Sequence, residues 1–133
     1  MGDDVYFSVP RVASVRWDDT HATVFVEWEG WANTAEFAAM LEAEIKALKE
    51  REGSRLLADC RRQRVLNRAD QERAEREWTP RVIEAGLKRF AIVPPVSDIA
   101  SNHLRERLGS MPKSAIQIRY FASVEEAREW LAR

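Results

Sequence analysis

The spacing of hydrophobic residues changes repeatedly along the chain, from every second residue to every third or fourth, and this alternation constrains the fold most strongly. Residues 12–17 and 22–28 alternate hydrophobic and polar side chains, and the polar residues 18–21 separate them. This pattern predicts a β-hairpin. The stretch after Gly30 predicts an amphipathic helix, because its hydrophobic residues recur at steps of three and four. They are Phe37, Met40, Leu41, Ile45 and Leu48.

Residues at both ends of this helix mark its boundaries. Asn33 can accept hydrogen bonds from free backbone amides, and Glu36 stands three residues later, as in a capping box. Gly53 can adopt the left-handed conformation that often ends a helix. We therefore expect the helix to lie between Asn33 and Gly53.

Two short hydrophobic runs, residues 55–60 and 89–93, predict buried parallel strands. The charged sequence between them predicts helix, but proline removes a backbone donor and interrupts a helix interior. We expect a short helix over residues 70–77 and a second helix that begins at Pro80, with Thr79 as its cap. The side chains expected to face the core are Ala74, Trp78, Val82 and Ile83.

The last third of the chain predicts a helix, a strand and a helix. Ser97 is placed to cap a helix that reaches Gly109, residues 115–121 alternate as a strand, and Ser123 with Glu126 forms a second capping box. The hydrophobic residues of the first of these helices are Ile99, Leu104 and Leu108. Those of the final helix are Val124, Ala127, Trp130 and Leu131.

The resulting order, β-β-α-β-α-β-α-β-α, predicts an α/β fold with a mixed, mostly parallel sheet of about five strands and about four helices. Parallel neighbours need crossover connections, while the opening hairpin adds an antiparallel pair. The 133 residues fit one domain, over 1–133.

Composition narrows the class of protein. The formal net charge of -1 disfavours nucleic acid or an anionic membrane as partner. The single cysteine, Cys60, cannot form an internal disulfide, and the first residues lack the pattern of an export signal, so we expect a cytoplasmic protein. No hydrophobic run is long enough for a membrane span.

Four stretches carry a resemblance to a known family: "VFVEWEGWAN", "RLLADCR", "AGLKRFAIVPP" and "YFASVEEAREWL". With the order of elements, they resemble the STAS superfamily, specifically its small bacterial stand-alone SpoIIAA-like branch, also described as STAS/SEC14-like. The resemblance implies helices packed on one main sheet, and roles in protein regulation or in binding small ligands or lipids. It implies no enzymatic activity.

One departure from the family pattern changes the expected regulation. Anti-sigma-factor antagonists carry a phosphorylatable Ser or Thr after the third predicted strand, at the start of the next helix. The corresponding stretch here, "CRRQRVLNRADQERAERE", contains neither residue. Phosphorylation of a hydroxyl group in this loop is therefore excluded.

The same loop is rich in arginine. Its arginines, Arg61, Arg62, Arg64 and Arg68, have no aromatic residues among them and are followed by acidic residues. This pattern favours a solvated surface or a contact with an anionic partner over a nucleic-acid site.

Other candidate residues lie near the ends of predicted strands, where open α/β sheets usually bind ligands. Asp59 is expected to order the loop as a hydrogen-bond acceptor, and Cys60 to be a buried structural thiol. After the next strand come Ser97, Asn102 and His103, which could border the same edge. His21, in the hairpin turn, is expected to be solvated.

Trp28 and Trp31 flank Gly30 and could stack a ligand or anchor a partner, although core and rim packing is favoured. No catalytic set, metal site or cofactor motif is recognisable. We therefore expect a non-enzymatic regulatory or interaction module, with a protein partner or a homodimer and a filled interior. The alternative is a carrier or sensor of an apolar small molecule or lipid, held under the first helix with its head group near Arg61 or Arg62. A remote alternative is a hydrolase that uses Asp59, Ser97 and His103.

Overall fold

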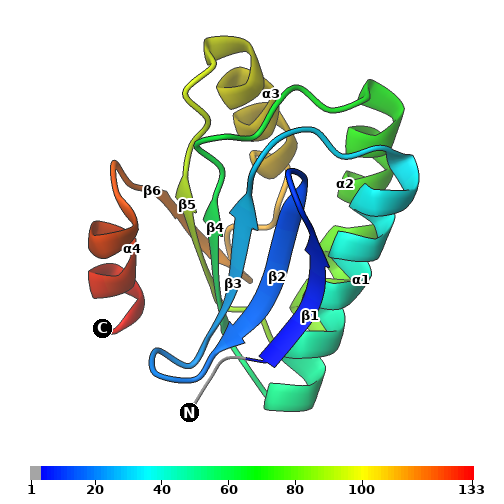
Figure 1. The fold of residues 1–133 in the computed structure, drawn as a ribbon. Helices are drawn as coiled ribbons and strands as arrows, with labels where there is room; N and C mark the ends of the chain where they lie inside the picture. The colour runs from blue at the N-terminus through cyan, green and yellow to red at the C-terminus, as the bar shows by residue number, and fades with distance from the viewer. Residues whose placement is uncertain (1–3) are drawn as a thin grey trace.

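Six strands form one sheet in chain order in the computed structural model, which describes residues 4–133 (Figure 1). The strands are β1 (Asp4–Val9), β2 (Ala13–Asp18), β3 (Thr23–Trp28), β4 (Arg55–Asp59), β5 (Arg89–Val93) and β6 (Gln117–Tyr120). The helices are α1 (Thr34–Arg51), α2 (Arg68–Glu84), α3 (Asp98–Leu108) and α4 (Val124–Leu131). The predicted α/β class and mixed, mostly parallel sheet are confirmed, with six strands where about five were expected.

The sheet order places the helices. Strands β1 to β3 pair antiparallel, and β3 to β6 pair parallel without any reversal of order. Because crossovers between parallel strands are right-handed, α1, α2 and α3 lie on the same face. The final helix, α4, covers the other face (Figure 1). Alternate residues of each strand serve the two faces: Val24 and Val26 pack under α1 to α3, whereas Phe25 packs under α4.

The additional strand, β1, precedes the predicted hairpin. It pairs with β2 from Asp4 opposite Trp17 to Val9 opposite Ala13. Its alternating Val5, Phe7 and Val9 were a signal for a strand, but a weak one, because β1 is an edge strand in which half of the residues are exposed and none is buried. The sheet therefore begins eight residues earlier than the sequence pattern indicated.

The predicted capping box of α1 is confirmed. The amide of Glu36 donates to Asn33 Oδ1 over 2.8 Å, and the amide of Asn33 donates to Glu36 Oε1 over 3.0 Å. The prediction for Gly53 was wrong: the left-handed residue is Glu52, with φ 49°. A glycine is favoured at position 53 because a Cβ there would lie only 3.0 Å from the ring of Trp17.

The predicted break at Pro80 does not occur. Helix α2 runs through this residue, and Thr79 lies inside the helix rather than capping one. Trp78 and Val82, on either side, are both buried against the sheet. Burial of two such side chains contributes about 1.5–3 kcal/mol each, which offsets the roughly 3 kcal/mol cost of an interior proline.

The last two helices begin as predicted. Ser97 accepts a hydrogen bond from Ala100 N over 3.3 Å at the start of α3, and Ser123 accepts one from Glu126 N over 3.2 Å at the start of α4. In α3, however, Ile99 is 62% exposed. The first turn of this helix lies beyond the carboxyl ends of the strands (Figure 1), and only its inner side, with Ala100, is buried.

Candidate functional site

Three loops leave the carboxyl ends of β3, β4 and β5 on the same side of the molecule (Figure 1). Backbone hydrogen bonds join them. The amide of Arg64, after β4, donates to the carbonyl of Gly30, after β3, over 3.2 Å. The amide of Val96, after β5, donates to the carbonyl of Arg61 over 3.2 Å. The loop after β4 is thus held between its two neighbours.

Exposed hydrophobic side chains gather on these loops and on the first turn of α3. Within residues 4–133, five large hydrophobic side chains are exposed, and only Val5 lies elsewhere. The other four are Trp31 (49% exposed), Val65 (40%), Val96 (82%) and Ile99 (62%). We call the surface formed by Trp31, Arg62, Arg64, Val65, Val96 and Ile99 the carboxyl-end surface. Such gathering marks contact sites more often than scattered hydrophobic residues do.

The two predicted tryptophans have different environments. Trp28 is buried and packs on Phe37, with ring centroids 6.0 Å apart. Trp31 is half exposed and belongs to the carboxyl-end surface. Only Trp31 is therefore available to a partner.

The four arginines also divide into two kinds. Arg61 pairs with Asp59, and Arg68 pairs with Glu72 over 3.3 Å. Arg62 and Arg64 are exposed, and neither forms a side-chain hydrogen bond or ion pair with any residue of 4–133. These two guanidinium groups are the positive charges that the surface presents.

Asp59 orders the start of the loop after β4. Its buried carboxylate accepts hydrogen bonds from Arg61 Nε over 2.9 Å, from Arg61 Nη2 over 2.7 Å, and from the Arg61 amide over 3.3 Å. Burial raises the pKa of this carboxyl group, but the hydrogen bonds from Arg61 outweigh it, and the pKa falls below its ordinary value. Asp59 is therefore ionised at neutral pH and holds the loop in place.

Cys60 has no nucleophilic character. Its thiol is buried on the opposite face of the sheet from Asp59, and burial raises its pKa to about 12. A thiol with this pKa stays protonated at neutral pH, and the thiolate is the reactive form.

Asp59, Ser97 and His103 do not come together. Strand alternation points Asp59 toward the face covered by α4, where Arg61 senses the charge of Glu125. Ser97 caps α3, and His103 faces α2 across a cleft on the other side of the sheet. None of the three is hydrogen-bonded to another, and the neighbouring Asn102 is exposed. A triad of these residues has no geometric basis.

The interior under α1 contains two ionisable side chains, Glu44 and Arg107, that were not among the predicted site residues. Glu44 is buried, and loss of hydration raises its pKa to about 8. The charge of Arg107 lowers the pKa of this carboxyl, as does Trp78 Nε1, which is buried without a hydrogen bond of normal geometry, but burial outweighs both. Glu44, Trp78 and Arg107 line a cavity of about 40 Å³, little more than the roughly 30 Å³ that one water occupies in the liquid.

The spacing of the sequence contained a signal for Glu44. It stands four residues after Met40 and four before Leu48, on the buried stripe of the helix. Arg107 likewise lies between Leu104 and Leu108 in α3. A charge on a hydrophobic stripe is a better indicator of a buried polar site than a run of charges.

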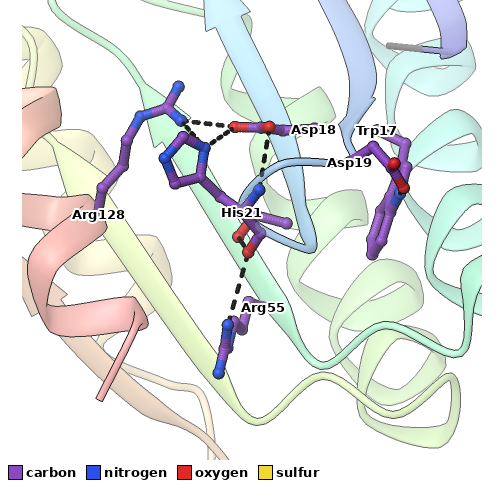
Figure 2. A network of polar contacts seen from close by, with 7 residues as sticks. Trp17, Asp18, Asp19, His21, Arg55 and Arg128 are labelled. Carbon is purple, nitrogen blue, oxygen red and sulfur yellow. Dashed lines mark hydrogen bonds and ion pairs between the residues drawn. The ribbon is translucent and has the colours of Figure 1, made fainter. Parts of the chain in front are cut away.

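A second polar network joins the β2–β3 turn to α4 at the other end of the sheet (Figure 2). Arg128 Nη1 donates to Asp18 Oδ2 over 2.5 Å, and His21 Nδ1 lies 2.7 Å from the same oxygen and 2.7 Å from Arg128. The carbonyl of His21 accepts hydrogen bonds from Thr23 and Arg55. His21 is exposed, as expected for a residue of the hairpin turn, and it also takes part in this network because α4 packs close to the turn.

Comparison with known proteins identifies the family. The SpoIIAA-like family model matches residues 23–132, which is most of the chain. The chain belongs to the SpoIIAA-like family. The match begins at β3, so that β1 and β2 lie outside it. No protein of curated function matches the chain.

A solved structure shows the same fold as this SpoIIAA-like domain. It is the crystal structure of an uncharacterised protein of the DUF3478 family with a SpoIIAA-like fold, from Shewanella loihica PV-4. The TM-score is 0.64 at 14% sequence identity, and the match covers 94% of this chain and 98% of that chain. At this identity the likeness concerns the fold alone.

Two further observations describe the SpoIIAA-like domain. Across residues 4–133, no helix is long and hydrophobic enough to cross a membrane. In the same range, no group of three or more His, Cys, Asp or Glu side chains is arranged to hold a metal ion.

Proposed function

We propose that this SpoIIAA-like domain is a non-enzymatic interaction module that binds a protein partner through the carboxyl-end surface. The observation that carries the proposal is the gathering of four exposed hydrophobic side chains and two arginines without ion pairs in residues 4–133. They lie on three loops that are bonded together and, for Ile99, on the first turn of α3. Loops on a rigid scaffold are a common place for recognition.

The chemistry of the surface defines the partner. Trp31 offers an exposed aromatic side chain as an anchor. Tryptophan, tyrosine and arginine are enriched among the few interface residues that contribute most of the free energy of binding. Arg62 and Arg64 favour carboxylates, which guanidinium groups bind in a bidentate manner. We infer a partner segment that carries acidic residues beside hydrophobic ones.

The topology supports a surface rather than an enclosed site. Open α/β sheets bind ligands in the crevice where the strand order reverses, and the order of this sheet never reverses. The cavity under α1 has about 40 Å³, against about 300–1,000 Å³ for typical ligand pockets. Neither Arg61 nor Arg62 lines it, so this arrangement gives no support to a lipid held there with its head group at these residues.

Control of this module differs from a phosphorylation switch. The residue that caps α2 is Asn67, whose Oδ1 accepts a hydrogen bond from Ala69 N over 2.8 Å. An amide side chain performs the capping that a hydroxyl would perform, but it cannot accept a phosphate. The cap of α2 therefore offers no phosphorylation switch.

Site-specific photo-crosslinking tests the proposal. In living cells, a photoreactive amino acid in place of Val65 should crosslink to one specific protein. The same photoreactive amino acid in place of the exposed Lys88 should not crosslink to that protein. The purified partner should then bind the domain, with affinity lowered at least about tenfold by the double substitution R62E/R64E and unchanged by R133E. Equal capture at both positions, or equal affinity of both variants, would contradict the proposal.

A further inference from the structure

β6 is the last strand of the sheet, and within residues 4–133 only β5 pairs with it (Figure 1). The amides of Gln117 and Phe121 both donate toward β5, over 2.9 Å and 2.8 Å. Because backbone groups alternate in direction along a strand, those of Ile118 and Tyr120 point away from β5, to the open edge. No residue from 4 to 133 forms a hydrogen bond with these outward groups. The edge therefore presents two amides and two carbonyls with which a further strand can pair.

The opposite edge of the sheet, β1, is protected against such pairing. Its register with β2 shifts between Val5 and Phe7, an irregularity of the β-bulge type. Bulges disrupt the ladder and twist an edge away from an added strand. The pairing of β6 with β5, in contrast, runs from Gln117 to Tyr120 without a shift. Of the two edges, β6 is thus the one whose geometry suits an additional strand.

A groove of about 510 Å³ borders this open edge. It is lined by all four residues of β6, by the connection from α3 and by Trp130 of α4. Its hydrophobic wall comes from Leu108, Met111 and Ile116, and the side chain of Ile118 packs on the same hydrophobic cluster. The volume lies within the roughly 300–1,000 Å³ of ligand-binding pockets, and the position along a strand suits an extended chain.

The charged side chains of the groove are both positive. Lys113 and Arg119 are exposed, and neither forms an ion pair with any residue of 4–133. Among these residues, no Asp or Glu lines the groove. Arg119 lies on the face of the strand opposite to Ile118, where its Cζ is 5.8 Å from the ring centroid of Trp130. The edge therefore has a hydrophobic side and a positively charged side.

We propose that β6 accepts, as a seventh strand, an extended segment of another protein in which hydrophobic and acidic residues alternate. Successive side chains of a strand point to opposite faces, so one row of the segment would lie against Ile118 and the other beside Arg119. In this mode of recognition, main-chain hydrogen bonds give affinity and alternate side chains give specificity. Opposite charges on neighbouring strands stabilise the pairing.

A second copy of this chain is a poorer occupant of the edge. A two-fold pairing of β6 with itself places Arg119 of both copies on the same face of a pairing only four residues long. Like charges on paired strands are destabilising, and charged residues on an edge are a common defence against self-pairing. No residue of the carboxyl-end surface lines the groove, so this inference does not depend on the proposed partner.

Fluorescence anisotropy with the purified domain tests the inference. The probes are three ten-residue peptides with a fluorophore at the amino terminus. One alternates valine and glutamate, one has the same composition with all valines before all glutamates, and one alternates valine and lysine. The alternating valine–glutamate peptide should bind at least about tenfold more tightly than either of the others, because only it matches both sides of the edge.

Variants and hydrogen exchange locate the site. The double substitution K113E/R119E should weaken binding of the alternating valine–glutamate peptide at least about tenfold, and R76E, at an exposed position of α2, should leave it unchanged. In the wild-type domain, this peptide should slow hydrogen exchange at the amides of Ile118 and Tyr120 and leave exchange in β1 unchanged.

Methylation of the peptide amides distinguishes an added strand from a ligand held by charge alone. In an extended chain, the valine amides point to one edge and the glutamate amides to the other. Methylation of the valine amides should abolish binding if the added strand is antiparallel to β6, and methylation of the glutamate amides should do so if it is parallel. One of the two methylated peptides should therefore bind, and the other should not.

Any of four results would overturn the inference. They are no binding of the alternating valine–glutamate peptide at millimolar concentration, equal affinity for the alternating and the block peptide, equal effects of the two methylations, and unchanged binding by K113E/R119E. Sedimentation of the domain alone as a dimer, with the amides of Ile118 and Tyr120 already protected from exchange, would show that a second copy occupies the edge and would also contradict the proposal.

Discussion

The carboxylate of Asp59 accepts a hydrogen bond from the Arg61 guanidinium group at each oxygen, over 2.9 Å at Oδ1 and 2.7 Å at Oδ2. This pair fixes the first residues after β4. The carbonyl of Arg61 in turn accepts the hydrogen bond from the amide of Val96. Through Arg61, therefore, one buried carboxylate positions two of the three loops that form the carboxyl-end surface.

Replacing Asp59 by Asn should loosen both loops. The substitution removes a charged acceptor of three hydrogen bonds, and we expect a loss of about 1–3 kcal/mol in the free energy of unfolding, measured in urea. Hydrogen exchange at the Val96 amide should accelerate. E72Q, which removes an exposed ion pair, should cost less than about 1 kcal/mol and leave Val96 protected. Unchanged exchange at Val96 in D59N would contradict the role of Asp59.

Glu44 should make stability fall as pH rises. Its pKa is about 8 in the folded protein against an ordinary 4.5, so that between these values the folded state holds a proton that the unfolded chain has released. Stability should therefore decrease from about pH 5 to pH 8, and the decrease should end above that range. E44Q should remove this dependence and raise stability at pH 9 by at least about 1 kcal/mol, the value of one pKa unit. The free energy of unfolding, measured in urea at pH 6 and at pH 9, should differ between the two pH values as much in the control E129Q as in the wild type. The same difference in E44Q would count against a neutral buried Glu44.

The thiol of Cys60 should be unreactive in the native protein. Because burial raises its pKa to about 12, labelling by a disulfide reagent at pH 8 should be at least about a hundredfold slower than in urea-unfolded protein. Absorbance of the released thiolate measures both rates. Rapid stoichiometric labelling of the folded chain would show that the thiol is accessible and would reopen the nucleophile interpretation.

The network between the hairpin turn and α4 should stabilise the fold at neutral pH. Burial raises the pKa of Asp18, but the hydrogen bonds from Arg128 and His21 outweigh it and lower the pKa below its ordinary value. This contribution is present above the ordinary carboxyl pKa of about 4 and is lost as pH falls through the lowered value. R128M should cost about 1–3 kcal/mol at pH 7, and R133M at the exposed terminus should cost less than about 0.5 kcal/mol. If R128M lost as much free energy of unfolding at pH 2 as at pH 7, the stabilisation by Arg128 would not be ionic.

Local signals predicted most of the fold. The capping residues Asn33 and Ser97 and the periodicity of the intervening segments placed the helices, because these signals act within a few residues. Pro80 and β1 were misread for a shared reason. The buried Trp78 and Val82 hold α2 together across the proline, and pairing with β2 holds the exposed β1, so long-range contacts decided both cases.

The candidate site was predictable only in part. Asp59 and the arginines after it could be placed at the strand end, because order of elements alone determines that position. Glu44 and Arg107 each stand on the hydrophobic stripe of a helix, but that they border one cavity depends on how α1 and α3 pack on the sheet. The separation of Asp59 from His103 likewise depends on strand alternation combined with the face that each helix covers.

The claim that the carboxyl-end surface binds a protein partner is tested most directly by nuclear magnetic resonance. The isotope-labelled domain is titrated with the purified, free form of the protein that photo-crosslinking identifies. The largest chemical-shift changes should fall at Trp31, Val65 and Val96 and the residues beside them, while the signals of α4 and β1 should stay unchanged. Changes centred on α4 or β1, with the carboxyl-end surface unaffected, would contradict it.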